Sequence, residues 1–183
     1  MLVSDFDYEL PSNLIAQEPA LSRAGSRLLV VDRASGTFAD SAFNRLPDFL
    51  RAGDVVVVND TRVFPARLIG AAIYAKGGEG LSASRKVEVF LIRPIGPLLW
   101  EALVKPGRNL RTGTRVKFTA DLSADALVCE IIQRLQDGRG IVRFEAAPDD
   151  LDSLVDKLGR TPLPPYIKRQ SEAASDSERY QTV

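Results

Sequence analysis

Hydrophobic and polar residues follow three different patterns along the chain. Residues 1–63 contain short apolar runs between turn formers, and residues 64–147 alternate repeatedly between apolar and polar side chains. After Pro148 the apolar residues return at helical spacing. Because strands and amphipathic helices have periods of about 2 and 3.6 residues, the order of the patterns predicts mixed α and β structure, then a set of antiparallel strands, then a helix.

The first segment predicts a hairpin and a buried strand. Residues 27–32 (RLLVVD) and 37–42 (TFADSA) read as two strands joined by a tight turn. Residues 55–58 (VVVV) lack alternation, which is typical of a strand buried on both faces. Residues 11–17 are expected to form a short helix with Leu14 and Ile15 turned inward.

The middle segment predicts several short antiparallel strands with one wet face. Turn formers such as Pro106-Gly107 and Asp137-Gly138 separate the alternating stretches. A barrel and a sandwich both satisfy this spacing. The last segment predicts a helix from Leu151 to Leu158, since its apolar residues recur at i, i+3, i+4 and i+7 and Gly159 follows directly.

Composition narrows the possible chemistry. The chain has no His and one Cys, which excludes His-dependent triads, an intrachain disulfide and a CxxC zinc site within these residues. No apolar run reaches the length of a membrane span, and the first residues do not resemble a secretory signal. We therefore expect a cytoplasmic protein without a membrane partner.

The balance of 24 basic and 24 acidic side chains hides a segregation of charge. Residues 1–63, 64–147 and 148–183 carry net charges of −3, +5 and −2. A basic middle segment is compatible with a polyanionic partner, although charge alone favours an ordinary solvated surface. Flexible basic positions such as Lys105 and Arg108 suit phosphate contacts, although no aromatic residues alternate with them.

The polar quartet Asn59, Asp60, Thr61 and Arg62 follows the predicted buried strand directly. A rigid strand positions such residues for catalysis or binding: Asp60 can act as a base and Arg62 can pair with a carboxylate or phosphate. The alternative is a turn in which the Asn and Asp side chains bind their own backbone.

Three further positions have both a functional and a structural interpretation. Asp7 lies in the run DFDYE, where clustered carboxylates can perform acid–base work or form a solvated strand. Trp100 reads as a barrel-core aromatic in preference to a ligand-stacking ring. Cys129 reads as an inert core residue in preference to a nucleophile. Glycine-rich phosphate loops are missing.

Ordered motifs give the chain a specific resemblance. They are residues 5–11 (DFDYELP), 14–17 (LIAQ), 26–30 (SRLLV), 58–63 (VNDTRV), 65–68 (PARL), 86–89 (KVEV), 100–107 (WEALVKPG), 163–167 (LPPYI) and 178–183 (ERYQTV). Together they resemble the S-adenosylmethionine:tRNA ribosyltransferase-isomerases of queuosine biosynthesis. The resemblance implies an α+β fold, in which residues 1–63 and 148–183 form part of a mixed α/β domain and residues 64–147 form an inserted antiparallel β-barrel.

The resemblance also implies a reaction. S-adenosylmethionine serves as a ribosyl donor and not as a cofactor, and no metal or redox cofactor is implied. The ribosyl unit is transferred to the aminomethyl group of a 7-deazaguanine in the tRNA anticodon and rearranged to give epoxyqueuosine, while adenine and methionine leave. The acceptor must be recognised as a splayed anticodon base. We expect a monomer whose partners are tRNA and S-adenosylmethionine.

Candidate roles follow from motif position and side-chain chemistry. Asp60 and Arg62 are the expected catalytic residues. The expected substrate-binding residues are Asn59, Thr61, Asp7 and Tyr180, and the expected tRNA contacts are Arg67, Lys105 and Arg108. Family members are about twice this length, so we expect a fragment that is inactive alone. The alternatives are a noncatalytic RNA-binding barrel and a purely structural barrel.

Overall fold

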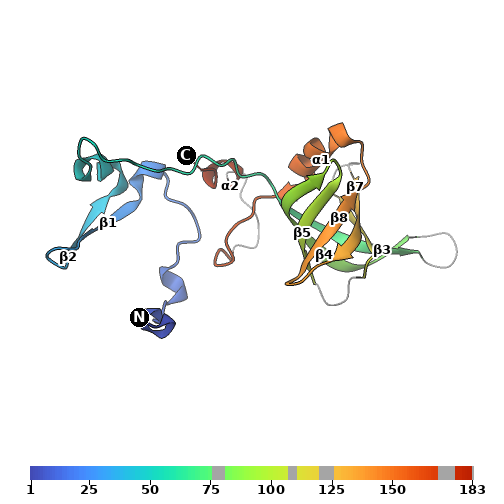
Figure 1. The fold of residues 1–183 in the computed structure, drawn as a ribbon, viewed down its shortest axis with the longest axis horizontal. Coiled ribbons are helices and arrows are strands. Elements are labelled where there is room, and N and C mark those ends of the chain that lie inside the picture. Colours follow the sequence, from blue (N-terminus) through green and yellow to red (C-terminus); the bar gives the residue numbers. More distant parts are fainter. Residues whose placement is uncertain (76–80, 107–110, 120–125, 169–175, 183) are drawn as a thin grey trace. The chain divides into compact units, whose positions relative to one another are not determined.

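The computed structural model of the chain describes residues 1–75, 81–106, 111–119, 126–168 and 176–182. Its contacts divide the chain into two units, which Figure 1 draws in sequence colours. The N-terminal unit comprises Met1–Thr61, Pro164–Ser171 and Thr182–Val183, and the barrel unit comprises Arg62–Leu163 and Glu172–Gln181. This division begins the barrel unit two residues before the predicted boundary and extends it past residue 147.

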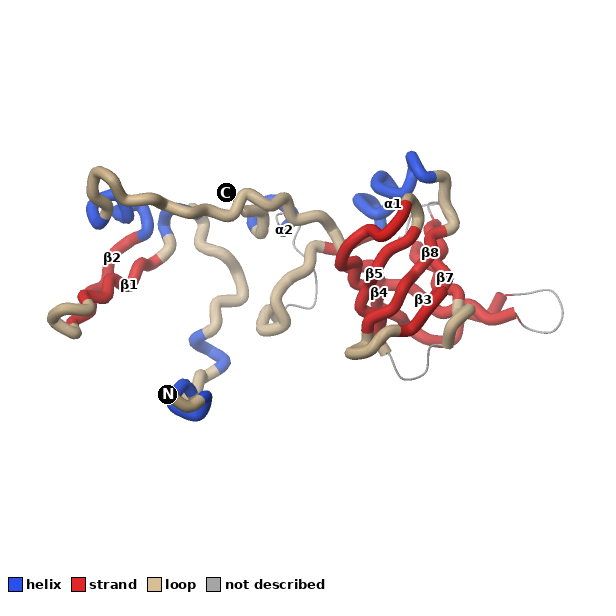
Figure 2. Tube along the Cα trace, in the orientation of Figure 1, coloured by secondary structure: helices blue, strands red, loops and turns tan. Residues whose placement is uncertain are grey.

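The barrel unit is built from six antiparallel strands that close on themselves (Figure 2). Around the described barrel the strand order is β3-β4-β5-β8-β7-β6, and pairing of β3 with both β4 and β6 closes it. The strands are β3 (Arg67–Ala75), β4 (Leu81–Gly96), β5 (Leu99–Lys105), β6 (Arg115–Thr119), β7 (Ala126–Arg134) and β8 (Arg139–Phe144). The predicted antiparallel set is therefore a barrel and not a sandwich, and the α+β class is confirmed.

Side-chain alternation fills the barrel. In β6, Val116 and Phe118 are buried, whereas Arg115, Lys117 and Thr119 are exposed. The same alternation in the neighbouring strands supplies one continuous core. Outside, ion pairs such as those of Glu101 with Arg93 and Arg139 link neighbouring strands. Register shifts in β4 and β7 mark bulges, which help strands bend around a closed barrel.

The predicted C-terminal helix is confirmed and lies against the barrel (Figure 1). A 3-10 turn, η6 (Pro148–Asp150), leads into α1 (Leu151–Leu158), and Leu151 and Val155 join the barrel core. Directly after the helix, β9 (Gly159–Arg160) pairs antiparallel with the start of β3. Apolar burial thus groups this helix with the barrel, whereas the sequence analysis assigns residues 148–183 to the first domain.

The N-terminal unit contains the predicted hairpin of β1 (Arg27–Asp32) and β2 (Thr37–Ala42). The Asp32 carboxylate accepts hydrogen bonds from the Ser35 and Ala34 amides, and these lower the pKa of Asp32. Gly36 completes the turn with φ +69°. The unit's other elements are the 3-10 turns η1 (Val3–Phe6), η2 (Ser12–Leu14), η3 (Arg23–Gly25) and η4 (Phe43–Phe49).

Two predictions for this unit are wrong. Residues 55–58 do not form a strand, and their side chains are 54–90 % exposed. The helix expected at residues 11–17 is only the short η2, and Leu14 is exposed rather than inward. The physical reason is shared: none of the described residues of the N-terminal unit is buried, so there is no core against which either apolar segment packs.

The thiol of Cys129 is fully buried in β7, as predicted, and burial raises its pKa. Because the thiolate is the reactive form, we expect native protein not to react with an aromatic disulfide reagent at pH 8. In denaturant one thiol per chain should react, since the chain has a single Cys. Reaction of the native protein at the unfolded rate would show that the core opens readily or that Cys129 lies outside it.

Candidate functional site

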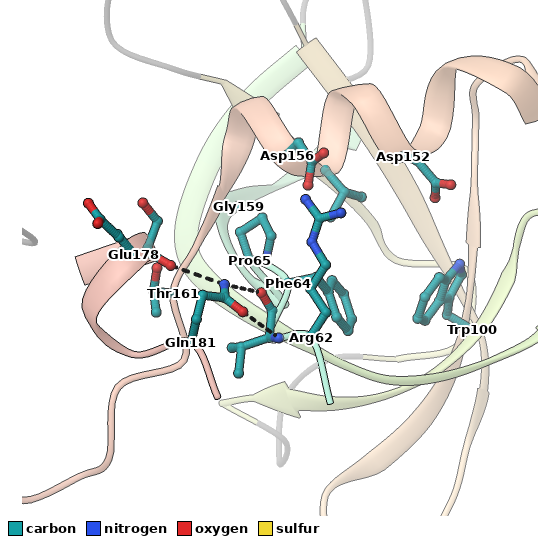
Figure 3. A pocket seen from close by; sticks show the side chains of 13 residues that line it. Arg62, Phe64, Pro65, Trp100, Asp152, Asp156, Gly159, Thr161, Glu178 and Gln181 are labelled. Atoms are coloured by element: carbon teal, nitrogen blue, oxygen red, sulfur yellow. Dashed lines mark hydrogen bonds between the residues drawn. The ribbon is translucent and has the colours of Figure 1, made fainter. Parts of the chain in front are cut away.

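A pocket of about 850 Å³ lies within the barrel unit, beside α1. Its wall combines the segment of residues 62–65 before β3, the start of β5, one side of α1, β9 and the residues of α2 (Asp176–Arg179) (Figure 3). The lining residues are Arg62, Val63, Phe64, Pro65, Trp100, Asp152, Val155, Asp156, Gly159, Thr161, Ser177, Glu178 and Gln181. Segments far apart in sequence therefore build one recess.

The Gln181 side chain holds the segment before β3 in place. Its Oε1 accepts a hydrogen bond from the Val63 amide at 2.9 Å, and its Nε2 donates to the Val63 carbonyl at 2.7 Å. Nε2 also donates to the Ser177 carbonyl at 3.0 Å. Gln181 thus pairs with both the N–H and the C=O of Val63. This fixes the backbone from which the side chains of Arg62 and Phe64 extend. Figure 3 shows these bonds as dashed lines.

Aromatic rings form one part of the pocket wall. The Phe64 and Trp100 ring centroids are 5.9 Å apart and the planes are inclined by 47°. Both residues pack partly against the barrel core. Trp100 was predicted as a core aromatic. It is only half-buried, because it also lines the pocket. A tilted pair of this kind stabilises its own contact without one ring covering the other completely.

Charged side chains form another part of the wall. Asp152 and Asp156 are four residues apart on α1 and therefore share a helix face. Figure 3 shows the Arg62 side chain extending toward this helix. Glu178 of α2 adds a third carboxylate. The lining thus contains three carboxylates and one guanidinium, so the pocket has an excess of negative charge.

Among the described residues, Arg62 is the only predicted site residue that lines this pocket. Asn59 instead forms a local turn: its Oδ1 accepts from the Thr61 amide at 3.0 Å and from the Thr61 hydroxyl at 2.6 Å. The Thr61 carbonyl accepts a hydrogen bond from the Thr182 hydroxyl. Asp60 is exposed and does not line the pocket.

The other predicted residues lie outside the lining. Asp7 follows η1 and is exposed, and the Tyr180 amide donates to the Asp176 carbonyl at 3.0 Å. Arg67 pairs with Glu88 at 2.8 Å on the barrel surface. Lys105 is exposed at the end of β5, and Arg108 lies outside the described residues.

Several lining residues were not predicted as site residues. Asp152 and Asp156 carried a usable signal, because their i, i+4 spacing places both on one face of a securely predicted helix. Two carboxylates on one face of a helix are nevertheless also typical of an ordinary solvent-exposed face, so the spacing alone does not indicate a site. Phe64, Trp100 and Gln181 had no such signal, since their convergence depends on barrel closure and on the return of the chain at α2.

No three His, Cys, Asp or Glu side chains in the described ranges are grouped so that they could hold a metal ion. Within the same ranges, no helix is long and apolar enough to cross a membrane.

Comparisons with known proteins agree along the whole chain. The family model described as "Queuosine biosynthesis protein" matches residues 3–183. The S-adenosylmethionine:tRNA ribosyltransferase-isomerase of Solibacter usitatus is 46 % identical over 196 residues, covering 100 % of this chain and 53 % of the relative. The enzyme of the same name from Halothermothrix orenii is 42 % identical over 184 residues, covering 100 % of this chain and 49 % of the relative.

A solved structure is also similar in sequence. The crystal structure of S-adenosylmethionine tRNA ribosyltransferase from Thermotoga maritima is 33 % identical and covers 85 % of this chain and 49 % of its own, with a TM-score of 0.38. The chain spans about half the length of the curated relatives it matches. A match that extends over nearly every residue is decisive for family membership, and the chain belongs to the queuosine biosynthesis protein family.

Proposed function

We propose that this chain contributes to a tRNA-modifying ribosyltransferase-isomerase. In the proposed reaction, the ribosyl unit of S-adenosylmethionine is transferred to 7-aminomethyl-7-deazaguanine in the tRNA anticodon and isomerised, with release of adenine and methionine. The observation that carries the proposal is the 46 % identity over the entire chain to a relative bearing that activity in its name. A tRNA substrate implies action in the cytoplasm, and we retain the expectation of a monomer.

The pocket is the proposed place of this chain's contribution to the reaction. Its volume of about 850 Å³ lies in the usual range for small-molecule sites. The reaction needs a base for the proton beside the sulfonium and a polar environment for the departing adenine. Arg62 is the lining group that can stabilise negative charge developing on adenine or bind a substrate carboxylate. Asp60 remains the proposed base, although it does not line the pocket.

Arg62 and Asp60 can be tested in a chimaera in which these 183 residues replace the matching half of the Solibacter usitatus relative. We expect Arg62→Ala to lower adenine release with substrate tRNA by about 10²-fold, the size of effect seen when a positioned charge-stabilising group is removed. Asp60→Asn should cause a similar loss if Asp60 is the base. Adenine is measured by mass spectrometry under single-turnover conditions.

Arg33→Ala provides the matched control, because Arg33 is an exposed arginine in the β1–β2 turn. It should leave adenine release unchanged. Turnover by Arg62→Ala equal to that of the parent chimaera would remove Arg62 from the reaction, and the same result for Asp60→Asn would remove Asp60.

The proposed tRNA contacts differ in whether their side chains already have a partner in this structure. Lys105 is exposed and suits a phosphate contact. Arg67 is already paired with Glu88, so a phosphate would have to compete with that carboxylate. The same surface would serve a noncatalytic RNA-binding barrel, which predicts salt-dependent tRNA affinity without any release of adenine.

A further inference from the structure

We propose that the pocket binds a flat heteroaromatic base joined to an organic cation, with the base on Trp100 and the cation beside Asp152 and Asp156. The choice of candidate ligands rests on the proposed function. Both reacting groups of that function have this chemistry: S-adenosylmethionine carries adenine, a sulfonium and an ammonium group, and the acceptor base of the tRNA carries a protonated aminomethyl group. Asp152 and Asp156 then act as specificity-determining residues.

The aromatic wall carries the first step. Trp100 is half-buried, is anchored against the barrel core and borders the open volume. Since its contact with Phe64 is tilted by 47°, Phe64 does not stack on the indole. Purine-like rings gain affinity by stacking on such an aromatic side chain. The pocket therefore offers a platform for a planar ring.

The carboxylates carry the second step. Asp152 and Asp156 project from α1 on the pocket side (Figure 3). Neither side-chain carboxylate forms a hydrogen bond or ion pair with any residue in the described part of the chain. Because like charges repel at short range, this wall disfavours a phosphate and favours a cation. Arg62, the opposite charge in the lining, provides a partner for the methionine carboxylate of S-adenosylmethionine, which the acceptor base lacks.

Tryptophan fluorescence tests the proposal directly, because Trp100 is the only tryptophan in the chain. The chain is titrated with S-adenosylmethionine, with 7-aminomethyl-7-deazaguanine, and with adenosine and guanine as counterparts without the cation. We expect a saturable change in Trp100 emission with at least one cationic ligand, and affinity at least about fivefold weaker for its uncharged counterpart. Whichever cationic ligand binds shows whether the pocket takes the ribosyl donor or the acceptor base.

The double variant Asp152→Asn/Asp156→Asn should bind that cation about tenfold more weakly, a loss of about 1.4 kcal/mol, because it removes the charge-assisted contacts with the ligand. Its affinity for the uncharged counterpart should stay the same. Asp149→Asn/Asp150→Asn is the matched control, because these acidic residues precede α1 and do not line the pocket. Thermal unfolding followed by Trp100 emission verifies that each variant is folded.

Two results would overturn the inference: no response to either cation, or equal affinity of the parent and the Asp152/Asp156 variant for the cation. These readouts are independent of turnover. If the chimaera releases no adenine while the chain still binds a cation through Asp152 and Asp156, the proposed function fails and the pocket chemistry stands. If the chimaera releases adenine and the Asp152/Asp156 variant binds the cation as tightly as the parent does, the proposed function stands and the pocket inference fails.

Discussion

Replacing Phe118 by alanine is expected to lower the free energy of unfolding of the barrel unit by about 3–5 kcal/mol. Phe118 is one of the largest fully buried side chains and lies in the centre of β6. Its ring lies against β3 at Gly70, where an added Cβ would come within 2.6 Å of the ring. Because Gly70 has no side chain, it contributes nothing that could fill the cavity left by the ring.

Urea unfolding followed by Trp100 emission measures this loss, since the single tryptophan lies in the barrel unit. Phe38→Ala is the matched control: Phe38 is 76 % exposed in β2, and its removal should change stability by no more than about 0.5 kcal/mol. Equal effects of the two substitutions would mean that Phe118 is not a core residue.

Replacing Gly159 by alanine is expected to have the second large effect, on both stability and the pocket. An added Cβ would lie 2.0 Å from the Pro65 carbonyl oxygen and 2.6 Å from that of Val155. The Gly159 backbone is extended, with φ −77° and ψ 161°, so alanine is allowed conformationally and the penalty arises from the clash. Overpacking of this kind costs about 1–3 kcal/mol or more.

Relief of the clash must move β9 away from the segment before β3, and both Gly159 and Pro65 line the pocket. We therefore expect weaker ligand-induced change in Trp100 emission as well as a lower urea midpoint. Gly96→Ala is the matched control, because its Cβ would meet only ordinary contacts of 3.5 Å with Leu99. Parent-like stability and binding for Gly159→Ala would show that β9 does not pack closely on β3.

The barrel could be predicted because its signal is local. In β6, the apolar residues Val116 and Phe118 alternate with polar neighbours. This alternation directly predicts which side chains face inward. The helix of Leu151 and Val155 has the same property at helical spacing. Closure of the sheet has no such local signal in the sequence. It requires β3 to pair with both β4 and β6, which depends on bulges and register that alternation does not encode.

Residues 55–58 illustrate why the N-terminal prediction was wrong. A run of valines indicates a buried strand only if neighbouring strands cover it, and none of the described residues of this unit is buried. Of the described residues that line the pocket, Arg62 was predicted as a site residue, and Asp152 and Asp156 carried a signal in their helical spacing that was not used. Trp100 and Gln181 reach it through tertiary structure, and the strand-end rule that singled out Asp60 depended on the strand that did not form.

The central claim is that these residues serve a ribosyl transfer that consumes S-adenosylmethionine. The most direct test incubates the chimaera of this chain and the Solibacter usitatus relative with S-adenosylmethionine and tRNA bearing 7-aminomethyl-7-deazaguanine, and quantifies products by mass spectrometry. We expect one adenine and one methionine to be released for each modified tRNA. Folded chimaera that binds this tRNA in a salt-dependent manner and releases neither product would contradict it and favour the noncatalytic RNA-binding barrel.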